Sequence, residues 1–143
     1  MIYLDTSFVT PLFRVEPSST GVANFVARQP SGILAVSKWT CVEFASVVSR
    51  SVRMGGLSAE AGRDLVEVFD ATVAASFAVL VPNSYDFELA GEYIANFATQ
   101  LRAPDALHLA VAHNNGVEFV ATLDEGMLSA AKRLKIPARR AIR

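Results

Sequence analysis

The chain has little of several residue types that define common classes of protein site. Its 143 residues include one cysteine, Cys41, and two histidines, His108 and His113. A single cysteine excludes an intrachain disulfide and a cysteine-based metal cluster, and we expect Cys41 to be a small buried apolar residue. Two histidines are too few for a histidine-based metal motif, so we interpret both as partly buried side chains with satisfied ring nitrogens.

Long apolar runs and a secretory leader are also missing. Hydrophobic residues make up 52% of the chain, but no apolar run approaches the roughly 20 residues that cross a bilayer. The first residues, Met1 to Asp5, lack the basic and apolar regions of a signal peptide. We therefore expect a soluble, cytoplasmic protein without membrane association. The length fits one domain over residues 1–143.

Familiar catalytic motifs are absent too. The sequence has no GxGxxG, GxxxxGK[ST], HExxH or GxSxG segment. Residues 5–7 lack the second aspartate expected of a phosphatase that uses an aspartyl nucleophile and a DxD motif. These absences exclude the usual dinucleotide, P-loop, zincin and serine-hydrolase sites.

Charge is nearly balanced but unevenly distributed. The net charge is −1, yet six of the thirteen basic residues fall in the last twelve positions: Lys132, Arg133, Lys135, Arg139, Arg140 and Arg143. This basic end suits nucleic-acid phosphate. It also suits an ordinary solvated helix end, because cations are favourable at helix C-termini.

Apolar runs alternate with helix-starting residues along the chain. The predicted strands cover residues 1–4, 33–36, 77–81 and 117–123, with a last edge strand over 136–142 that Pro137 breaks. The predicted helices cover residues 7–14, 17–28, 38–55, 59–76, 83–101, 104–114 and 125–134, with Ser37, Ser58 and Asp124 as N-caps. This alternation predicts an α/β fold with a mainly parallel sheet covered on both faces.

Four acidic residues fall where such a fold brings segments together: Asp5, Glu43, Asp105 and Asp124. Asp5 and Asp124 each end an apolar run, and Asp105 follows the proline that opens a helix. The carboxyl ends of strands form the ligand crevice of open α/β sheets. Carboxylates crowded there repel one another, and a hard cation such as Mg²⁺ or Mn²⁺ prefers oxygen ligands. The working hypothesis is metal-dependent phosphoryl chemistry.

Each acid also has an ordinary structural interpretation. Asp5 and Asp124 suit helix N-caps, and Asp105 suits the positive end of its helix. Glu43 is harder to explain this way, because apolar neighbours such as Val42 predict a largely buried helix in which an unpaired charge is costly. The four acids together favour a shared site.

Small hydroxyl residues accompany these acids. Thr6 and Ser7 follow Asp5, and Thr122 precedes Asp124 by two positions. Their hydroxyls suit contacts to a metal-bound water, a carboxylate or a phosphate oxygen. Local capping of backbone groups is an equally good interpretation.

Four segments, in this order and spacing, carry a family resemblance: IYLDTS, WTCVEFAS, LRAPDALHLAVA and FVATLDEGM. Together they resemble the PIN-domain ribonucleases, and especially the VapC toxins of toxin–antitoxin pairs. The resemblance implies a PIN-like α/β/α sandwich, an RNA substrate, a homodimer, and a small VapB-like antitoxin whose C-terminal segment blocks the active site. It implies catalytic and metal-binding roles, with Mg²⁺ or Mn²⁺, for Asp5, Glu43, Asp105 and Asp124, and supporting roles for Thr6 and Thr122.

Residues and resemblance together predict a metal-dependent ribonuclease that hydrolyses RNA phosphodiester bonds with water as the nucleophile. One alternative is a non-catalytic nucleic-acid-binding module, although a pure binder gains from cations and not from clustered carboxylates. A second alternative is a metal-dependent phosphatase of small phosphoesters. A third interpretation makes the acids helix caps only.

Overall fold

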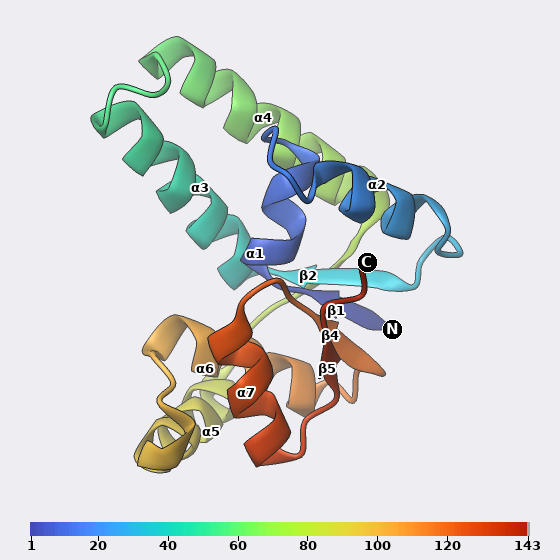
Figure 1. Cartoon of the computed structure of the whole chain (residues 1–143), viewed down its shortest axis with the longest axis vertical. Helices are drawn as coiled ribbons and strands as arrows, with labels where there is room; N and C mark the ends of the chain where they lie inside the picture. Colours follow the sequence, from blue (N-terminus) through green and yellow to red (C-terminus); the bar gives the residue numbers. More distant parts are fainter. Residues whose placement is uncertain (143) are drawn as a thin grey trace.

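A five-stranded parallel sheet runs through the middle of the molecule (Figure 1). The structure is a computed structural model, and it describes residues 1–142. The strand order is β3-β2-β1-β4-β5, and every neighbouring pair is parallel. The strands are β1 (Ile2–Leu4), β2 (Leu34–Ser37), β3 (Ala78–Leu80), β4 (Phe119–Ala121) and β5 (Ala138–Arg139). The predicted α/β fold is confirmed.

Helices cover both faces of the sheet. They are α1 (Thr6–Val9), α2 (Ser19–Ala27), α3 (Lys38–Arg53), α4 (Ala59–Ser76), α5 (Ser84–Ala95), α6 (Ala103–Asn114) and α7 (Glu125–Leu134), with short 3₁₀ turns η1 (Thr10–Leu12) and η2 (Phe97–Thr99). Figure 1 shows α1–α4 on one side, where α3 and α4 form a projecting hairpin, and α5–α7 on the other. Among the described helices, none has the length and apolarity that crossing a bilayer requires.

Alternation along the short strands builds a separate core on each face. Ile2 and Leu4 point into the core beneath α1–α4, whereas Tyr3 points into the core beneath α5–α7. Val120, the register partner of Tyr3 on β4, joins the second core together with Met127 of α7. Full burial of a large apolar side chain contributes about 1.5–3 kcal/mol. Because successive side chains of a strand point to opposite faces of the sheet, the position of a residue along β1 or β4 decides which of the two cores it joins.

Local capping fixes several helix starts where the sequence predicts them. Ser37 caps α3 in a capping box with Thr40, Ser58 caps α4, and Asp124 caps α7. Each side-chain oxygen accepts a hydrogen bond from a backbone N–H that the first turn leaves unpaired.

The helix predicted through Leu101 ends earlier, at Ala95. Asn96 leaves the helical conformation with ψ 82°, and Gln100 is left-handed with φ 55°. The Thr99 hydroxyl donates to the carbonyl oxygen of Asn96 at 2.9 Å, which stabilises the turn η2. A side-chain hydrogen bond of this kind competes with continuation of a helix.

Two other predicted boundaries and one predicted burial are also wrong. The first helix ends at Val9 and gives way to a 3₁₀ turn that contains Pro11, because proline cannot donate the next helical hydrogen bond. The last strand covers only residues 138–139. The strand that precedes α5 is half-buried and not buried, because β3 lies at an edge of the sheet.

Candidate active site

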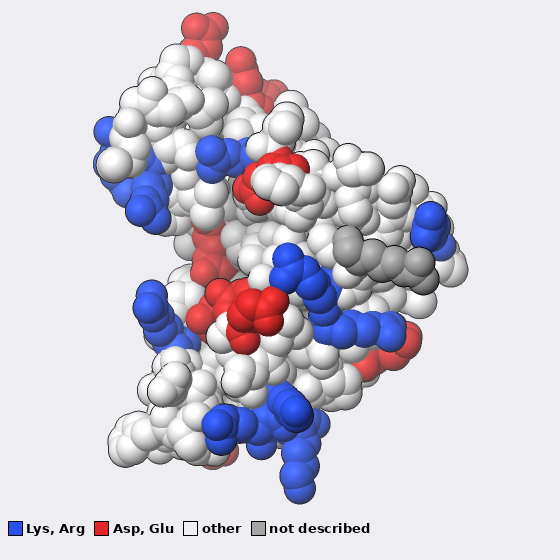
Figure 2. All heavy atoms as spheres, in the orientation of Figure 1, with Lys and Arg blue, Asp and Glu red and all other residues white. Residues whose placement is uncertain are grey.

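All four predicted acids line one cavity of about 410 Å³. The cavity lies where β1 and β4 end and where α6 and α7 begin, as the parallel sheet requires. Its lining consists of Asp5, Thr6, Ser7, Thr10, Glu16, Glu43, Val47, Asp105, His108, Leu123 and Asp124. Figure 2 shows acidic side chains gathered at the middle of this face, with basic side chains on several sides of them.

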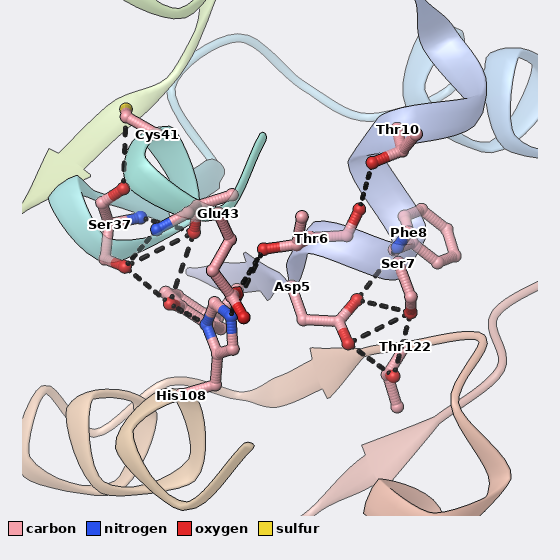
Figure 3. Close-up of polar contacts among 12 residues, drawn as sticks. Asp5, Thr6, Ser7, Phe8, Thr10, Ser37, Cys41, Glu43, His108 and Thr122 are labelled. Atoms are coloured by element: carbon pink, nitrogen blue, oxygen red, sulfur yellow. Dashed lines mark hydrogen bonds and ion pairs between the residues drawn. The ribbon is translucent and has the colours of Figure 1, made fainter. Parts of the chain in front are cut away.

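Asp5 is held by a dense set of donors at the end of β1. Its side chain is buried and accepts hydrogen bonds from the Thr122 hydroxyl at 2.6 Å, the Ser7 hydroxyl at 2.8 Å and the Phe8 N–H at 2.8 Å. The Thr122 hydroxyl in turn accepts from the Asp124 N–H at 3.0 Å. This network joins the end of β1 to the turn between β4 and α7 (Figure 3).

Burial raises the pKa of the Asp5 carboxyl. His108 and the hydrogen bonds from Thr122, Phe8 and Ser7 act in the opposite direction but do not cancel the cost of desolvation. Asp5 therefore caps α1. It also presents to the cavity a carboxyl group whose ionisation costs free energy unless a cation lies nearby.

Glu43 reaches the cavity from the second turn of α3, and its side chain is 22% exposed. Its Oε2 accepts a hydrogen bond from the Thr6 hydroxyl at 2.5 Å and a second, short one from Nε2 of His108. Burial acts to raise the pKa of Glu43, but the contacts with His108 and Thr6 outweigh it, so the pKa is lowered. The hydrogen bond from His108 thus offsets the free-energy cost of burying the Glu43 carboxylate.

The expectation of a largely buried helix around Glu43 is wrong in part. Val42, the preceding residue, is 57% exposed. The helix buries one side, with Phe44 and Val48 in the core, and leaves the other open. Glu43 lies near the boundary between these sides, which is why its carboxylate reaches both the cavity and a buried imidazole.

The side chains of Asp105 and Asp124 lie outside these networks, at the starts of α6 and α7. Asp124 is exposed and caps α7 by accepting from the Met127 N–H at 2.7 Å. Burial, followed by repulsion from Asp124, raises the pKa of Asp105 to about 6. Glu43 and Asp5 add to that repulsion, while His108 opposes it. Within the described part of the chain, the Asp105 side chain therefore lacks the hydrogen-bond donors that hold Asp5 and Glu43, and it lies closest in effect to another carboxylate, that of Asp124.

The donor set of the cavity suits a hard divalent cation. Four carboxylates supply oxygen ligands of the kind that Mg²⁺ and Mn²⁺ prefer. Their mutual repulsion, recorded in the raised pKa of Asp105, is what a cation would relieve. Across residues 1–142, however, no three His, Cys, Asp or Glu side chains already stand close enough to hold one ion. Binding therefore requires the acids to approach one another.

The two histidines behave differently from each other. His108 is 1% exposed, and its ring nitrogens contact the Tyr3 hydroxyl at Nδ1 and Glu43 at Nε2. His113 is exposed near the end of the same helix, so the prediction of a partly buried side chain is wrong for it. One feature of the sequence points to the contact between His108 and Tyr3. Tyr3 lies in a predicted strand, and a buried tyrosine usually needs a hydrogen-bond partner.

The basic C-terminal segment makes contacts within the chain. Arg140 pairs with Glu125 at 2.8 Å. The Arg139 guanidinium lies 3.5 Å from the centroid of the Phe119 ring. Arg143 lies outside the described residues. These contacts favour the interpretation of this segment as an ordinary solvated end.

Comparisons with known proteins place the chain in a family. The model of the PIN domain matches residues 2–133, and no curated protein matches the chain. Among solved structures, the chain is similar to the sarcin-ricin loop cleaving toxin VapC20 of Mycobacterium tuberculosis, with a TM-score of 0.69, 20% identity, and coverage of 91% of this chain and 95% of that one. It is also similar to FitAcB from Neisseria gonorrhoeae (TM-score 0.69, 18% identity, 99% and 98% coverage) and to VapBC-1 from nontypeable Haemophilus influenzae (0.65, 18%, 97% and 97%). These structures share the fold, and the family match shows that the chain belongs to the PIN domain family.

Proposed function

We propose that the protein is a metal-dependent ribonuclease that hydrolyses RNA phosphodiester bonds. The observation that carries the proposal is the convergence of four carboxylates on one cavity at the carboxyl ends of β1 and β4. An uncompensated cluster of this kind would repel an anionic substrate. With a divalent cation bound, the same cluster becomes a site that attracts phosphate.

The residues that would hold Mg²⁺ or Mn²⁺ are Asp5, Glu43, Asp105 and Asp124. When bound, such an ion supplies an activated water and neutralises charge on the phosphate. The chain contributes orientation, because Ser7 and Thr122 donate to Asp5 and Thr6 donates to Glu43. Before a cation binds, the Asp105 carboxyl, with its pKa raised to about 6 by burial and by Asp124, is the group suited to hold a proton.

The similar structures support a proposal about partners. VapC20 is described as a toxin that cleaves the sarcin-ricin loop, and VapBC-1 shares its fold with this chain. We therefore propose that the protein is the toxin of a toxin–antitoxin pair, with an RNA substrate and a VapB-like antitoxin. We further propose that it acts as a homodimer in the cytoplasm.

The direct test is cleavage of a single-stranded RNA by the purified protein. Wild type should cleave with added Mg²⁺ or Mn²⁺ and should be inactive in excess EDTA. Asp105→Asn should be inactive under all conditions, whereas Asp64→Asn, which changes an exposed aspartate of α4, should be fully active. Full cleavage by wild type in EDTA would exclude the metal mechanism.

The size of the cavity supports one alternative. At about 410 Å³ it falls within the range of about 300–1,000 Å³ typical of small-ligand pockets, which suits a metal-dependent phosphatase. Mn²⁺-dependent turnover of p-nitrophenyl phosphate with RNA left intact would favour that reading. RNA binding without cleavage of either substrate would favour the non-catalytic binding module.

A further inference from the structure

A chain of buried hydrogen bonds leads from the start of α3 to the carboxylate of Glu43. The Ser37 hydroxyl lies 2.7 Å from the Tyr3 hydroxyl, which lies 2.7 Å from Nδ1 of His108. Nε2 of the same ring contacts Oε2 of Glu43, which also accepts from the Thr6 hydroxyl. Figure 3 shows the ring of His108 beside Glu43 and Thr6, opposite the network around Asp5.

The chemistry of the groups fixes the direction of these bonds. An ionised carboxylate only accepts hydrogen bonds, so Nε2 of His108 must carry the proton that faces Glu43. Burial raises the pKa of Tyr3, which keeps its hydroxyl protonated and able to donate to Nδ1. The hydroxyls of Ser37 and Thr40 then satisfy the remaining capacity of the Tyr3 oxygen. Each link orients the next.

Both donors to Glu43 act on the same oxygen. Thr6 and His108 contact Oε2, which fixes the plane of the carboxylate and leaves Oε1 for another partner. The Glu43 side chain lines the cavity that also contains Asp5 and Asp105. A carboxylate held by one oxygen and free at the other is suited to bind a cation through that second oxygen.

We propose that His108, fixed by Tyr3, is a positioning residue that holds Glu43 with Oε1 directed to the divalent cation of the cavity. This inference rests on the proposed function, because it assigns a role toward the cation that function requires. His108 itself is not a ligand, since its two nitrogens are engaged by Tyr3 and Glu43.

The arrangement has a second consequence for the geometry of the site. His108 and Asp105 are three residues apart on α6, so the contact to Glu43 also sets the position of α6 against α3. Glu43 is thereby fixed relative to α6, as Asp5 is fixed relative to the turn after β4. Asp105 and Asp124, which lie outside the network, are the acids that must approach when a cation binds.

The test is a double-mutant cycle on Mn²⁺ affinity, measured on the metal-free protein from the electron paramagnetic resonance signal of unbound Mn²⁺. Tyr3→Phe, His108→Leu and His108→Gln are each made alone and in a Glu43→Gln background. Changes to groups that orient a metal ligand typically weaken metal binding about 10–100-fold. We expect Tyr3→Phe and His108→Leu to weaken Mn²⁺ binding within that range, and His108→Gln, which keeps an N–H near the position of Nε2, to recover part of the loss.

The Glu43→Gln background separates positioning from a general structural effect. If His108 and Tyr3 act through Glu43, their substitution should change the affinity of Glu43→Gln little. Equal fold-losses in both backgrounds would overturn the proposal. Tyr85→Phe and His113→Gln, which change an exposed tyrosine and an exposed histidine, should bind Mn²⁺ like wild type.

Two further outcomes are distinguishable. If Glu43→Gln binds Mn²⁺ weakly while Tyr3→Phe and His108→Leu bind it like wild type, the positioning role is wrong and the proposed function stands. If Glu43→Gln itself binds like wild type, Glu43 is not a ligand and the positioning proposal is overturned, while Asp5, Asp105 and Asp124 still support the proposed function. Should His108→Leu fail to fold, the Tyr3→Phe and His108→Gln cycles give the same test.

Discussion

The two sides of the cavity hold their acids in different ways. On the β1 and α3 side, Asp5 and Glu43 accept hydrogen bonds from hydroxyl groups, a backbone N–H and an imidazole. On the α6 and α7 side, Asp105 stands near Asp124 without such support, and its pKa is raised to about 6, first by burial and then by Asp124. The pKa of Glu43 is lowered instead, because its partners outweigh the cost of burial. Hydrogen bonds hold both acids of the first half in place, although burial still raises the pKa of Asp5, whereas Asp105 in the second half has no comparable donors among the described residues.

A substitution on either side of the cavity should abolish most RNA cleavage. Glu43→Gln and Asp105→Asn each remove one candidate ligand charge. Because changes to groups behind a ligand already cost about 10–100-fold, each substitution should reduce RNA cleavage by at least about 100-fold. The measurement is the initial cleavage rate at saturating Mn²⁺, with Asp64→Asn as the matched control. Near-normal cleavage by either variant would remove that residue from the catalytic set.

Stability of the metal-free protein should distinguish the two sides. Glu43→Gln replaces charge-assisted hydrogen bonds with neutral ones, so it should lose about 1 kcal/mol of unfolding free energy. Asp105→Asn removes like-charge repulsion and should be level with wild type or more stable. Urea unfolding at neutral pH measures both. A stability loss in Asp105→Asn equal to that in Glu43→Gln would contradict the contrast.

The pH dependence of stability should differ between the sides as well. The folded-state pKa of Asp105 is about 6, raised by burial and Asp124 from an ordinary 3.8, so the folded state binds this proton more tightly than the unfolded state. Its contribution to stability is therefore present below about pH 4 and is lost as pH rises through about 6. In the metal-free protein, Asp105→Asn should remove the part of the decline in unfolding free energy that this titration causes between about pH 4 and about pH 6.

Glu43 should show the opposite sign. Its folded-state pKa is lowered by His108 and Thr6 in spite of burial. Its contribution is thus present above its unfolded pKa and is lost as pH falls through the folded value. Urea unfolding from about pH 3 to about pH 7 measures both slopes. Indistinguishable pH profiles for wild type and Asp105→Asn would refute the assignment of the raised pKa.

The smallest expected effect concerns the basic C-terminal segment. Arg139 contacts the Phe119 ring and Arg140 pairs with Glu125. Exposed cation–π contacts and exposed ion pairs each contribute at most about 1 kcal/mol. Replacing both arginines with Ala should weaken RNA binding only a few-fold at low salt, by about one phosphate contact or less in the salt slope. A large loss of affinity with a much flatter salt dependence would show that the segment is a principal RNA contact.

Sequence alone was sufficient to predict that the four acids lie near one another, because the topology of a parallel sheet brings their positions to one cavity. Asp5 and Asp124 follow strands, and parallel strands end on the same side. It was not sufficient to find how Glu43 is held. His108 lies 65 positions from Glu43 and 105 from Tyr3, and no local pattern reports contacts across such separations.

Helix starts were predicted better than helix ends. Ser37 and Ser58 mark the starts of α3 and α4, because their side-chain oxygens cap the first turn of each helix. The end of α5 at Ala95 depends on a left-handed Gln100 and on the hydroxyl of Thr99. Neither glutamine nor threonine is a strong signal for a helix end. The apolar periodicity therefore predicted a helix that extends past Ala95 to Leu101.

The most direct test of the account is the position of Mn²⁺ in crystals soaked with that ion, located by its anomalous scattering. We expect a peak within the cavity, bound by Oε1 of Glu43 and by carboxylate oxygens of Asp5 and Asp105. We also expect that His108 keeps its contacts to Glu43 and Tyr3 and that Asp105 moves toward the ion. A cavity without a peak at saturating Mn²⁺, in protein that cleaves RNA under the same conditions, would contradict the account.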